Sequence, residues 1–190
     1  MQQPTAACAV LCKSAVLALG LLFSIAYSAD AEDVRVTDQS FGCIRDGFKV
    51  RNTYIRNADP EKLKEAIHIF EGREPNRSYP VGTFLQLLPS SVMVKHAKGE
   101  FPDTNGWEFF TLTLSPGGTR IRLRGDKIAN GAGVACISCH RRAAKFDYVC
   151  EKGHGCDPIS LLDDRKIAQL QGRDPRCLAK RGPTPGQDAR

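Results

Sequence analysis

The sequence predicts an α+β domain, built mainly from antiparallel strands with two or three short helices. Three observations lead to this fold class. A capped helical pattern covers residues 60–72, β-prone segments separated by turn residues fill 84–124, and a second helical pattern ends at Gly172. Because strands joined by short turns pair antiparallel, we expect the middle of the chain to form one antiparallel sheet.

Residues 1–31 have the pattern of a signal peptide. An uncharged, mostly apolar run from Ser14 to Tyr27 follows Lys13, and it is shorter than the roughly 20 residues that a membrane span needs. An uncleaved anchor is the alternative interpretation. We therefore expect export across a bacterial inner membrane to the periplasm, with no stable membrane span after cleavage. The domain would cover 32–182, and 183–190 would be a polar, disordered tail.

The first helix has clear boundaries. Asp59 is a good N-cap, Pro60 suits the first helical position, and Gly72 suits the end. Before it, 48–50 and 53–55 are expected to be extended. A second helix is expected after Pro158 and Ser160 and before Gly172, with a short one over 141–145.

Four segments between these helices are predicted to be strands that form a hairpin and antiparallel sheet: 84–88, 92–96, 107–114 and 119–124. In the last segment, alternation places Ile121 and Leu123 on one face. The other face would carry Arg120, Arg122 and Arg124. This row is either a solvated surface or a site for haem propionates or a partner protein, because guanidinium groups match carboxylates.

The most informative motif is Cys-x-x-Cys-His at residues 136–140. This pattern is the attachment sequence of a c-type haem. Cys136 and Cys139 would each bond one haem vinyl group, and His140 would be the proximal iron ligand. A redox dithiol and half of a zinc site are the alternatives. Cys150, His154 and Cys156 could complete a zinc site, but an exported protein disfavours zinc held by thiolates.

The remaining cysteines fit an oxidising compartment. Outside the signal segment and the haem motif there are four, which allow three pairings. We favour Cys150–Cys156, which closes a small loop, and Cys43–Cys177, which ties the two ends of the domain together.

The net charge of +6 is compatible with a redox partner or a membrane surface of acidic character. Basic chains often bind nucleic acid, but export and a haem motif argue against that partner.

The chain resembles the cytochrome P-460 family and the related cytochromes c′-β. The matching stretches, in the family's order, are 79–83, 92–95, 106–110 and 136–149. The resemblance implies a strongly curved antiparallel sheet, frequent homodimers, and one covalently bound haem c with an open or weakly filled distal side. Cytochrome P-460 itself oxidises hydroxylamine with a lysine cross-linked to the haem and a distal carboxylate, whereas cytochrome c′-β binds nitric oxide or carbon monoxide in a phenylalanine-lined pocket.

This sequence departs from the cytochrome P-460 pattern, because the strand after Gly82 and Thr83 contains no lysine. Lys95 on the next strand is the nearest candidate for the cross-link. Glu108 could serve as the distal carboxylate, although we expect it to be an exposed strand residue. His68 is expected to be a structural or surface histidine.

Four functions remain open. A redox carrier would need a sixth iron ligand, for which Met93, Lys95, His96 and His154 are candidates; no methionine follows the haem motif. A gas binder would use an open site lined by Phe84, Phe109 or Phe110. An oxidoreductase would act on hydroxylamine or another nitrogen oxide. A disulfide-rich binding module without haem is the fourth. We expect an exported monohaem cytochrome that transfers electrons, with binding or oxidation of small nitrogen oxides as the alternative.

Overall fold

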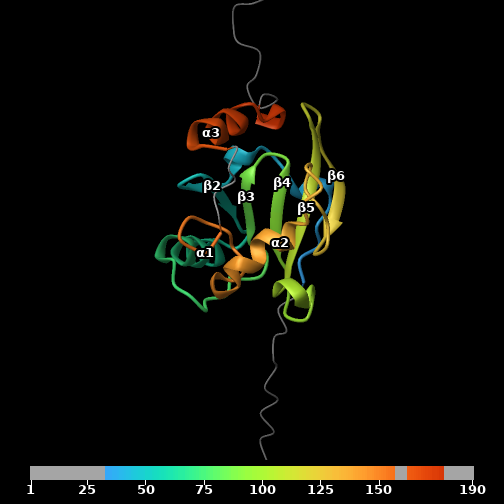
Figure 1. Ribbon diagram of the computed structural model, residues 1–190. Coiled ribbons are helices and arrows are strands. Elements are labelled where there is room, and N and C mark those ends of the chain that lie inside the picture. The colour runs from blue at the N-terminus through green and yellow to red at the C-terminus, as the bar shows by residue number, and fades with distance from the viewer. Residues whose placement is uncertain (1–32, 157–161, 178–190) are drawn as a thin grey trace, which may run out of the picture. The chain divides into compact units, whose positions relative to one another are not determined.

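The computed structural model describes residues 33–156 and 162–177. The predicted signal peptide and the predicted tail lie outside these residues. Three helices, α1 (Pro60–Gly72), α2 (Cys136–His140) and α3 (Asp164–Gly172), accompany one sheet (Figure 1). The sheet has six strands: β1 (Phe48–Val50), β2 (Thr53–Arg56), β3 (Phe84–Leu88), β4 (Ser91–Lys95), β5 (Trp107–Ser115) and β6 (Gly118–Gly125). Short 3₁₀ helices are η1 (Asp38–Ser40), η2 (Ile44–Asp46), η3 (Pro102–Thr104), η4 (Arg141–Phe146) and η5 (Pro175–Cys177). The predicted α+β class is confirmed.

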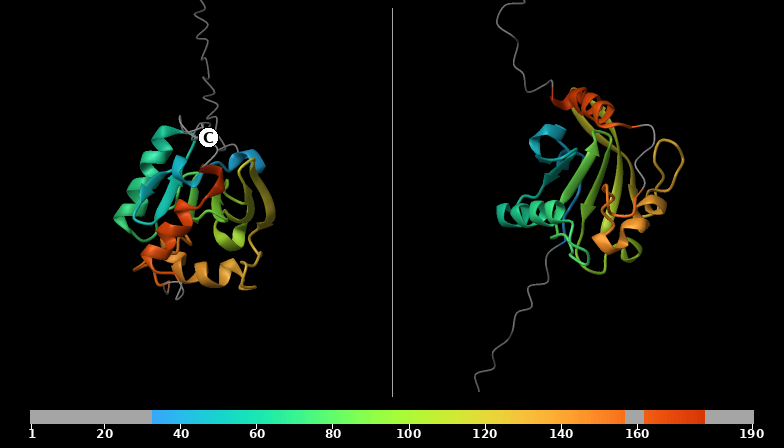
Figure 2. Two further views of the ribbon diagram at one scale, coloured as in Figure 1. Left: turned by 90° about the horizontal axis from the view of Figure 1, so that it is seen from above. Right: turned by 60° about the vertical axis from the view of Figure 1, so that its left-hand side comes forward.

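The sheet is an antiparallel meander. Each strand pairs with its neighbour in the chain, from β1 at one edge to β6 at the other. The two edge strands do not pair with each other, so the sheet does not close into a barrel. Figure 2 shows that its strands curve. Short turns produce this order, as between Ser115 and Gly118, where Gly118 has a φ of 136°.

Helix α1 follows the predicted boundaries. The Asp59 carboxylate accepts hydrogen bonds from the backbone N–H groups of Glu61 and Lys62, which occupies two of the donors left free at a helix start. Arg73 ends the helix in the left-handed conformation, with a φ of 52°. Its buried face is formed by Ala66, Ile69 and Phe70. His68 is exposed, as expected of a surface histidine.

Strand alternation divides the core between the two faces of the sheet. On the first face, which we call the motif face, Leu85, Met93, Trp107 and Phe109 pack with α1 and with Cys136 and Ile137 of α2. On the second face, which we call the N-terminal face, strand residues pack under the segment that leads into η1: Val92, Val94, Phe110 and Leu112 contact Val36 and Phe41.

A β-bulge overturns the predicted faces of β6. Thr111 pairs with Leu123 but Leu112 pairs with Ile121, so Arg122 is an extra residue without a partner across the strand pair. Ile121 therefore packs on the N-terminal face, whereas Leu123 lies on the other side and is 42% exposed. Arg120, opposite Thr113, and Arg124, opposite Phe110, lie on opposite faces. The predicted row of three arginines does not form.

The C-terminal helix starts later than predicted. It begins at Asp164, with Asp163 as its N-cap through a hydrogen bond from the Lys166 N–H, so Leu162 precedes it. Gln171 fastens α3 to the sheet by donating to the Asn52 and Leu87 carbonyl oxygens at 2.6 and 2.8 Å. None of the helices in the described residues is long and apolar enough to cross a membrane.

Both predicted disulfides are present. Cys43 and Cys177 join the beginning and end of the domain across 134 residues, and Cys150 and Cys156 close the short loop. The long closure restricts the unfolded chain far more than the short one.

Candidate functional site

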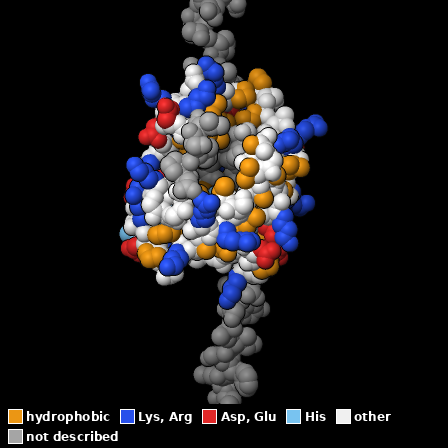
Figure 3. Space-filling model, in the orientation of Figure 1, with side chains coloured by type: hydrophobic (Ala, Val, Ile, Leu, Met, Phe, Trp, Pro, Cys, Tyr) orange, Lys and Arg blue, Asp and Glu red, His pale blue; other side chains and the backbone are white. Residues whose placement is uncertain are grey.

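Helix α2 brings the three motif side chains together. Cys136, Cys139 and His140 are related by i, i+3 and i+4, so they share one side of the helix. Cys136 is partly buried against the motif-face core, and Cys139 is exposed. In Figure 1, α2 lies in front of β3–β5, and Figure 3 shows hydrophobic side chains gathered around a hollow on this side of the molecule.

The two motif thiols are free, whereas the other four cysteines of the described residues form disulfides. Burial raises the pKa of the Cys136 thiol. A reactive redox dithiol needs a lowered thiol pKa, so this environment disfavours that alternative. The zinc alternative also loses two of its ligands, because Cys150 and Cys156 are bonded to each other.

His140 is oriented by two contacts. Its Nδ1 lies 2.8 Å from the Tyr148 carbonyl oxygen, and its ring packs against Phe109 with the centroids 4.8 Å apart. Burial lowers the pKa of His140, and the hydrogen bond to Tyr148 opposes that effect only in part. A neutral ring that donates Nδ1–H to a carbonyl carries its lone pair on Nε2, as a metal-binding histidine does.

The Tyr148 carbonyl belongs to a strained turn. Asp147 and Tyr148 are consecutive non-glycine residues in the left-handed region, with φ values of 53° and 60°. Such a conformation costs about 1–2 kcal/mol for each residue. The Asp147 carboxylate holds the turn by accepting a hydrogen bond from the Tyr79 N–H at 2.8 Å and others from Ser78 Oγ and Asn105 Nδ2.

Lys95 completes this cluster. Its Nζ lies 2.8 Å from each Asp147 oxygen and also donates to the Asn105 carbonyl. These contacts use all three hydrogens of an ammonium group. The side chains of Lys95 and Asp147 are 5% and 1% exposed. Burial lowers the pKa of Lys95, and Asp147 opposes that effect. In this arrangement Lys95 has no free lone pair for an iron ion or for a bond to a haem.

Two buried polar groups on the same face of β5 have no partner among the described residues. They are Trp107 Nε1 and Thr111 Oγ1, which flank Phe109 along the strand. Met93, opposite Phe109 on β4, is buried beside them. Buried donors are normally satisfied, so unpaired donors on either side of Phe109, whose ring packs on His140, are compatible with a bound group that has polar edges. The residues present thus fit a haem: two free thiols, one oriented imidazole, an apolar wall and unpaired donors.

The other candidate ligands lie elsewhere. His96 is on the N-terminal face, with Nδ1 2.9 Å from an Asp33 oxygen and Nε2 3.0 Å from a Glu108 oxygen. Phe84 and Phe110 also belong to that face, so of the three predicted pocket phenylalanines only Phe109 lies beside His140. His154 stacks on Phe146 and binds the Val149 carbonyl through Nδ1, and its buried Nε2 has no partner in the described part of the chain.

The expectation that Glu108 is exposed was wrong, because its side chain is buried. Arg124 contacts both its oxygens at 2.6 and 2.8 Å. Burial raises the pKa of Glu108, but contacts with His96 and Arg124 outweigh burial and lower it below its ordinary value. Glu108 faces away from α2, since it alternates with Trp107 and Phe109, so it is not placed to act as a carboxylate beside His140.

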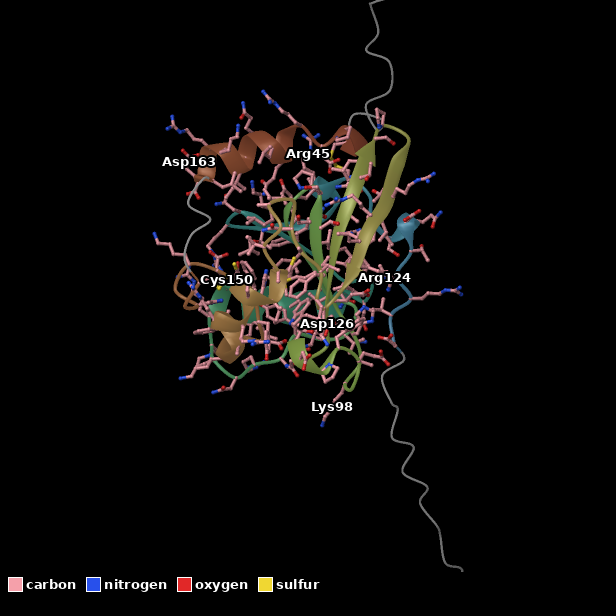
Figure 4. The ribbon with its side chains drawn as sticks, turned by 45° about the vertical axis from the view of Figure 1, so that its right-hand side comes forward. Arg45, Lys98, Arg124, Asp126, Cys150 and Asp163 are labelled. Carbon is pink, nitrogen blue, oxygen red and sulfur yellow. A yellow bond between two sulfur atoms is a disulfide. The ribbon has the colours of Figure 1, made fainter. Side chains whose placement is uncertain are left out.

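A disulfide lies next to the motif. The Cys150–Cys156 disulfide lies against α2, because Cys156 Sγ is 3.8 Å from the Cys139 carbonyl oxygen. Figure 4 shows Cys150 beside the segment formed by α2 and η4, and Arg124 towards one end of β6. The loop that follows His140 is therefore held at two points, by Lys95 at Asp147 and by this disulfide.

A scan against protein-family models finds no match, and searches of curated proteins and of solved structures find no significant match.

Sequence reasoning missed Asp147 and Asn105. Asp147 lies within the stretch 136–149 that carries the family resemblance, but it was given no role there, and both residues are separated from Lys95 in the chain. The sequence did contain a signal for Lys95. Side chains two residues apart on a strand point to the same face, so Lys95 points to the same side of the sheet as the core residue Met93. A charge in such a position requires a buried partner.

Proposed function

We propose that the chain binds one haem c through Cys136 and Cys139, with His140 as an axial iron ligand. The observation that carries this proposal is the hydrogen bond from His140 Nδ1 to the Tyr148 carbonyl, beside two thiols that stay free in a protein whose other described cysteines are paired. Together with the matching stretches of sequence, this site supports membership of the cytochrome P-460 family.

Electron transfer is the function we infer. The haem would supply one-electron cycling of iron, and the chain would hold it in a partly apolar shell that includes Phe109 and Met93. The protein would act in the periplasm, with a redox protein as partner. The two disulfides are compatible with an exported protein. A positive net charge would speed association with an acidic partner.

Binding or oxidation of small nitrogen oxides is the second candidate, and the surroundings of the proposed iron favour it specifically. Lys95 is bound to Asp147 in an ion pair, and His96 lies on the opposite face of the sheet. Of the candidate sixth ligands, Met93 and His154, whose Nε2 has no partner in the described part of the chain, then remain. A vacant position would admit nitric oxide or hydroxylamine.

The first test is expression together with the haem-maturation machinery. We expect the parent to carry one covalent haem, detected as a haem-stained band that survives denaturation and as a pyridine haemochrome spectrum. The matched control is Cys136→Ala/Cys139→Ala, which retains His140 and should lose the covalent attachment. A colourless parent protein would refute the proposal.

The second test separates the two functions. Absorption spectra of the oxidised and reduced protein are recorded before and after nitric oxide is added. A low-spin spectrum that the gas leaves unchanged indicates six-coordinate iron and supports electron transfer. A high-spin spectrum that shifts indicates an open position and supports nitrogen-oxide chemistry. A Met93→Leu variant that converts the first spectrum into the second would identify Met93 as the sixth ligand.

A further inference from the structure

We propose that Lys95 is a positioning residue for the proximal histidine: through Asp147, it holds the turn whose Tyr148 carbonyl orients His140. This inference depends on the proposed haem attachment, and it assigns Lys95 a role different from a cross-link to the haem.

Lys95 connects β4 directly to the turn at Asp147 and Tyr148. Lys95 ends β4, and its Nζ contacts both Asp147 oxygens at 2.8 Å, although the two residues are 52 positions apart in the chain. The pair is buried from solvent. Nζ also binds the Asn105 carbonyl and lies 5.2 Å from the centre of the Trp107 ring. The cation is therefore held by β4, β5 and the loop between them, which together form a rigid base.

This base maintains the conformation of the turn. Asp147 and Tyr148 both have positive φ values, which a tyrosine rarely adopts in the absence of constraints. The same carboxylate that binds Lys95 also accepts the Tyr79 N–H. Asp147 thus links the strained turn to two separate parts of the domain. It also directly precedes Tyr148, whose carbonyl oxygen binds His140.

The conformation of the turn affects the histidine. The Tyr148 carbonyl accepts the hydrogen bond from His140 Nδ1 at 2.8 Å. A hydrogen bond at the outer nitrogen of a ligating histidine increases the basicity of the ring and fixes its orientation. A more basic ligand stabilises ferric iron relative to ferrous iron, so a weaker bond raises the midpoint potential. Lys95 would then influence the haem iron without touching it.

The experiment measures the midpoint potential and the thermal unfolding midpoint of the matured protein. We expect Lys95→Met to raise the midpoint potential and lower the unfolding temperature, with the haem still attached. Lys95→Arg, which retains the charge and can bind Asp147 through two nitrogens, should restore the potential at least in part. If Lys95→Met does not fold, Asp147→Asn is the second variant, because it removes the charge but retains an oxygen that can accept the Tyr79 N–H.

The matched control is Arg176→Met. Arg176 and Asp174 form another buried ion pair, with side chains 3% and 0% exposed, and Asp174 likewise accepts a backbone N–H, that of Ile44. This pair lies beside the Cys43–Cys177 disulfide and not at the motif. We expect Arg176→Met to lower the unfolding temperature and leave the midpoint potential unchanged.

Two results would overturn the inference. The first is a Lys95→Met protein with the parent's midpoint potential, which would make Lys95 merely structural. The second is an equal shift in Arg176→Met, which would show that any loss of stability moves the potential. Failure of the proposed function is distinguishable from both, because the parent protein itself would then carry no covalent haem.

Discussion

Lys95 and His96 are neighbours in the chain, yet they serve opposite faces of the sheet. Lys95 faces α2 and binds Asp147, whereas His96 faces the N-terminal segment and lies between Asp33 and Glu108. Each is the centre of a buried charged cluster. The Lys95 cluster holds the loop that follows the Cys-x-x-Cys-His motif, and the His96 cluster fastens the start of the domain to β5 and β6.

The two faces differ in how their buried polar groups are paired. On the N-terminal face, both Glu108 oxygens are occupied by Arg124, and the surrounding core is closed by Val36 and Phe41. On the motif face, Trp107 Nε1 and Thr111 Oγ1 are buried without a described partner. The charged side chains of the N-terminal face are thus paired with one another, whereas the unpaired groups of the motif face suit it to receive a ligand.

The largest effect is expected from Asp147→Leu. The change leaves the Lys95 ammonium buried without its counter-charge, so the free energy of unfolding should fall by about 3–5 kcal/mol. Urea titration measures this value. The double variant Lys95→Met/Asp147→Leu should recover the part of the loss that comes from the unpaired ammonium group, whereas the part from the Tyr79 N–H, which lacks its acceptor in both variants, should remain. A loss below about 1 kcal/mol for the single variant would contradict the importance of the pair.

A smaller effect is expected on the other face from Glu108→Gln. The variant loses the charged contact with Arg124, whose side chain is 46% exposed and therefore partly hydrated. We expect the free energy of unfolding to fall by about 1–2 kcal/mol, measured by urea titration. The visible spectrum and midpoint potential should stay those of the parent, because Glu108 faces away from His140. A shift in potential would show that the two faces are coupled.

The third prediction concerns pH. Burial lowers the pKa of His96, but hydrogen bonds to the Glu108 and Asp33 carboxylates outweigh it and raise the pKa above its ordinary value of 6.5. Arg124, on the far side of Glu108, is the nearby cation. A raised histidine pKa contributes stability that is fully present below the unfolded-state pKa and is lost as pH rises through the folded-state value.

The free energy of unfolding should therefore decline as pH rises above about 6.5, the unfolded-state value, and through the raised folded-state pKa of His96. Urea titrations across this range measure the slope. His96→Gln, which cannot carry the charge, should abolish that part of the decline. An identical slope in the variant would assign the pH dependence to other groups.

The smallest effect is expected from Thr111→Val, which replaces an unpaired buried hydroxyl by a methyl group of similar size. We expect the free energy of unfolding to stay the same or rise by up to about 1 kcal/mol. The matched control is Thr104→Val, because the Thr104 hydroxyl is buried and contacts the Trp107 and Phe101 carbonyls. That control should lose about 1–2 kcal/mol. An equal loss in both variants would show that Thr111 has a partner, such as a bound haem.

Local patterns predicted much of this molecule. The N-cap of α1, the antiparallel sheet, the contiguous Cys-x-x-Cys-His motif and both disulfides were predicted from residue types and their spacing in the chain. The prediction of which β6 side chains share a face was wrong, because one extra residue in β6 shifts the alternation of side chains between the two faces. The bulge at Arg122 separated Ile121 from Leu123, and no pattern in the strand itself indicates which residue will lack a partner.

The sequence by itself determined which residues could attach a haem and which cysteines remained to pair, because each of these features depends on residues close together or on counting. Only the tertiary structure decided that Lys95 binds Asp147, that Glu108 is buried, and that the Tyr148 carbonyl meets His140. The physical reason is that a buried charge takes its partner from whichever segment the fold brings near, and Lys95 and Asp147, 52 positions apart in the chain, share no local signal of that contact.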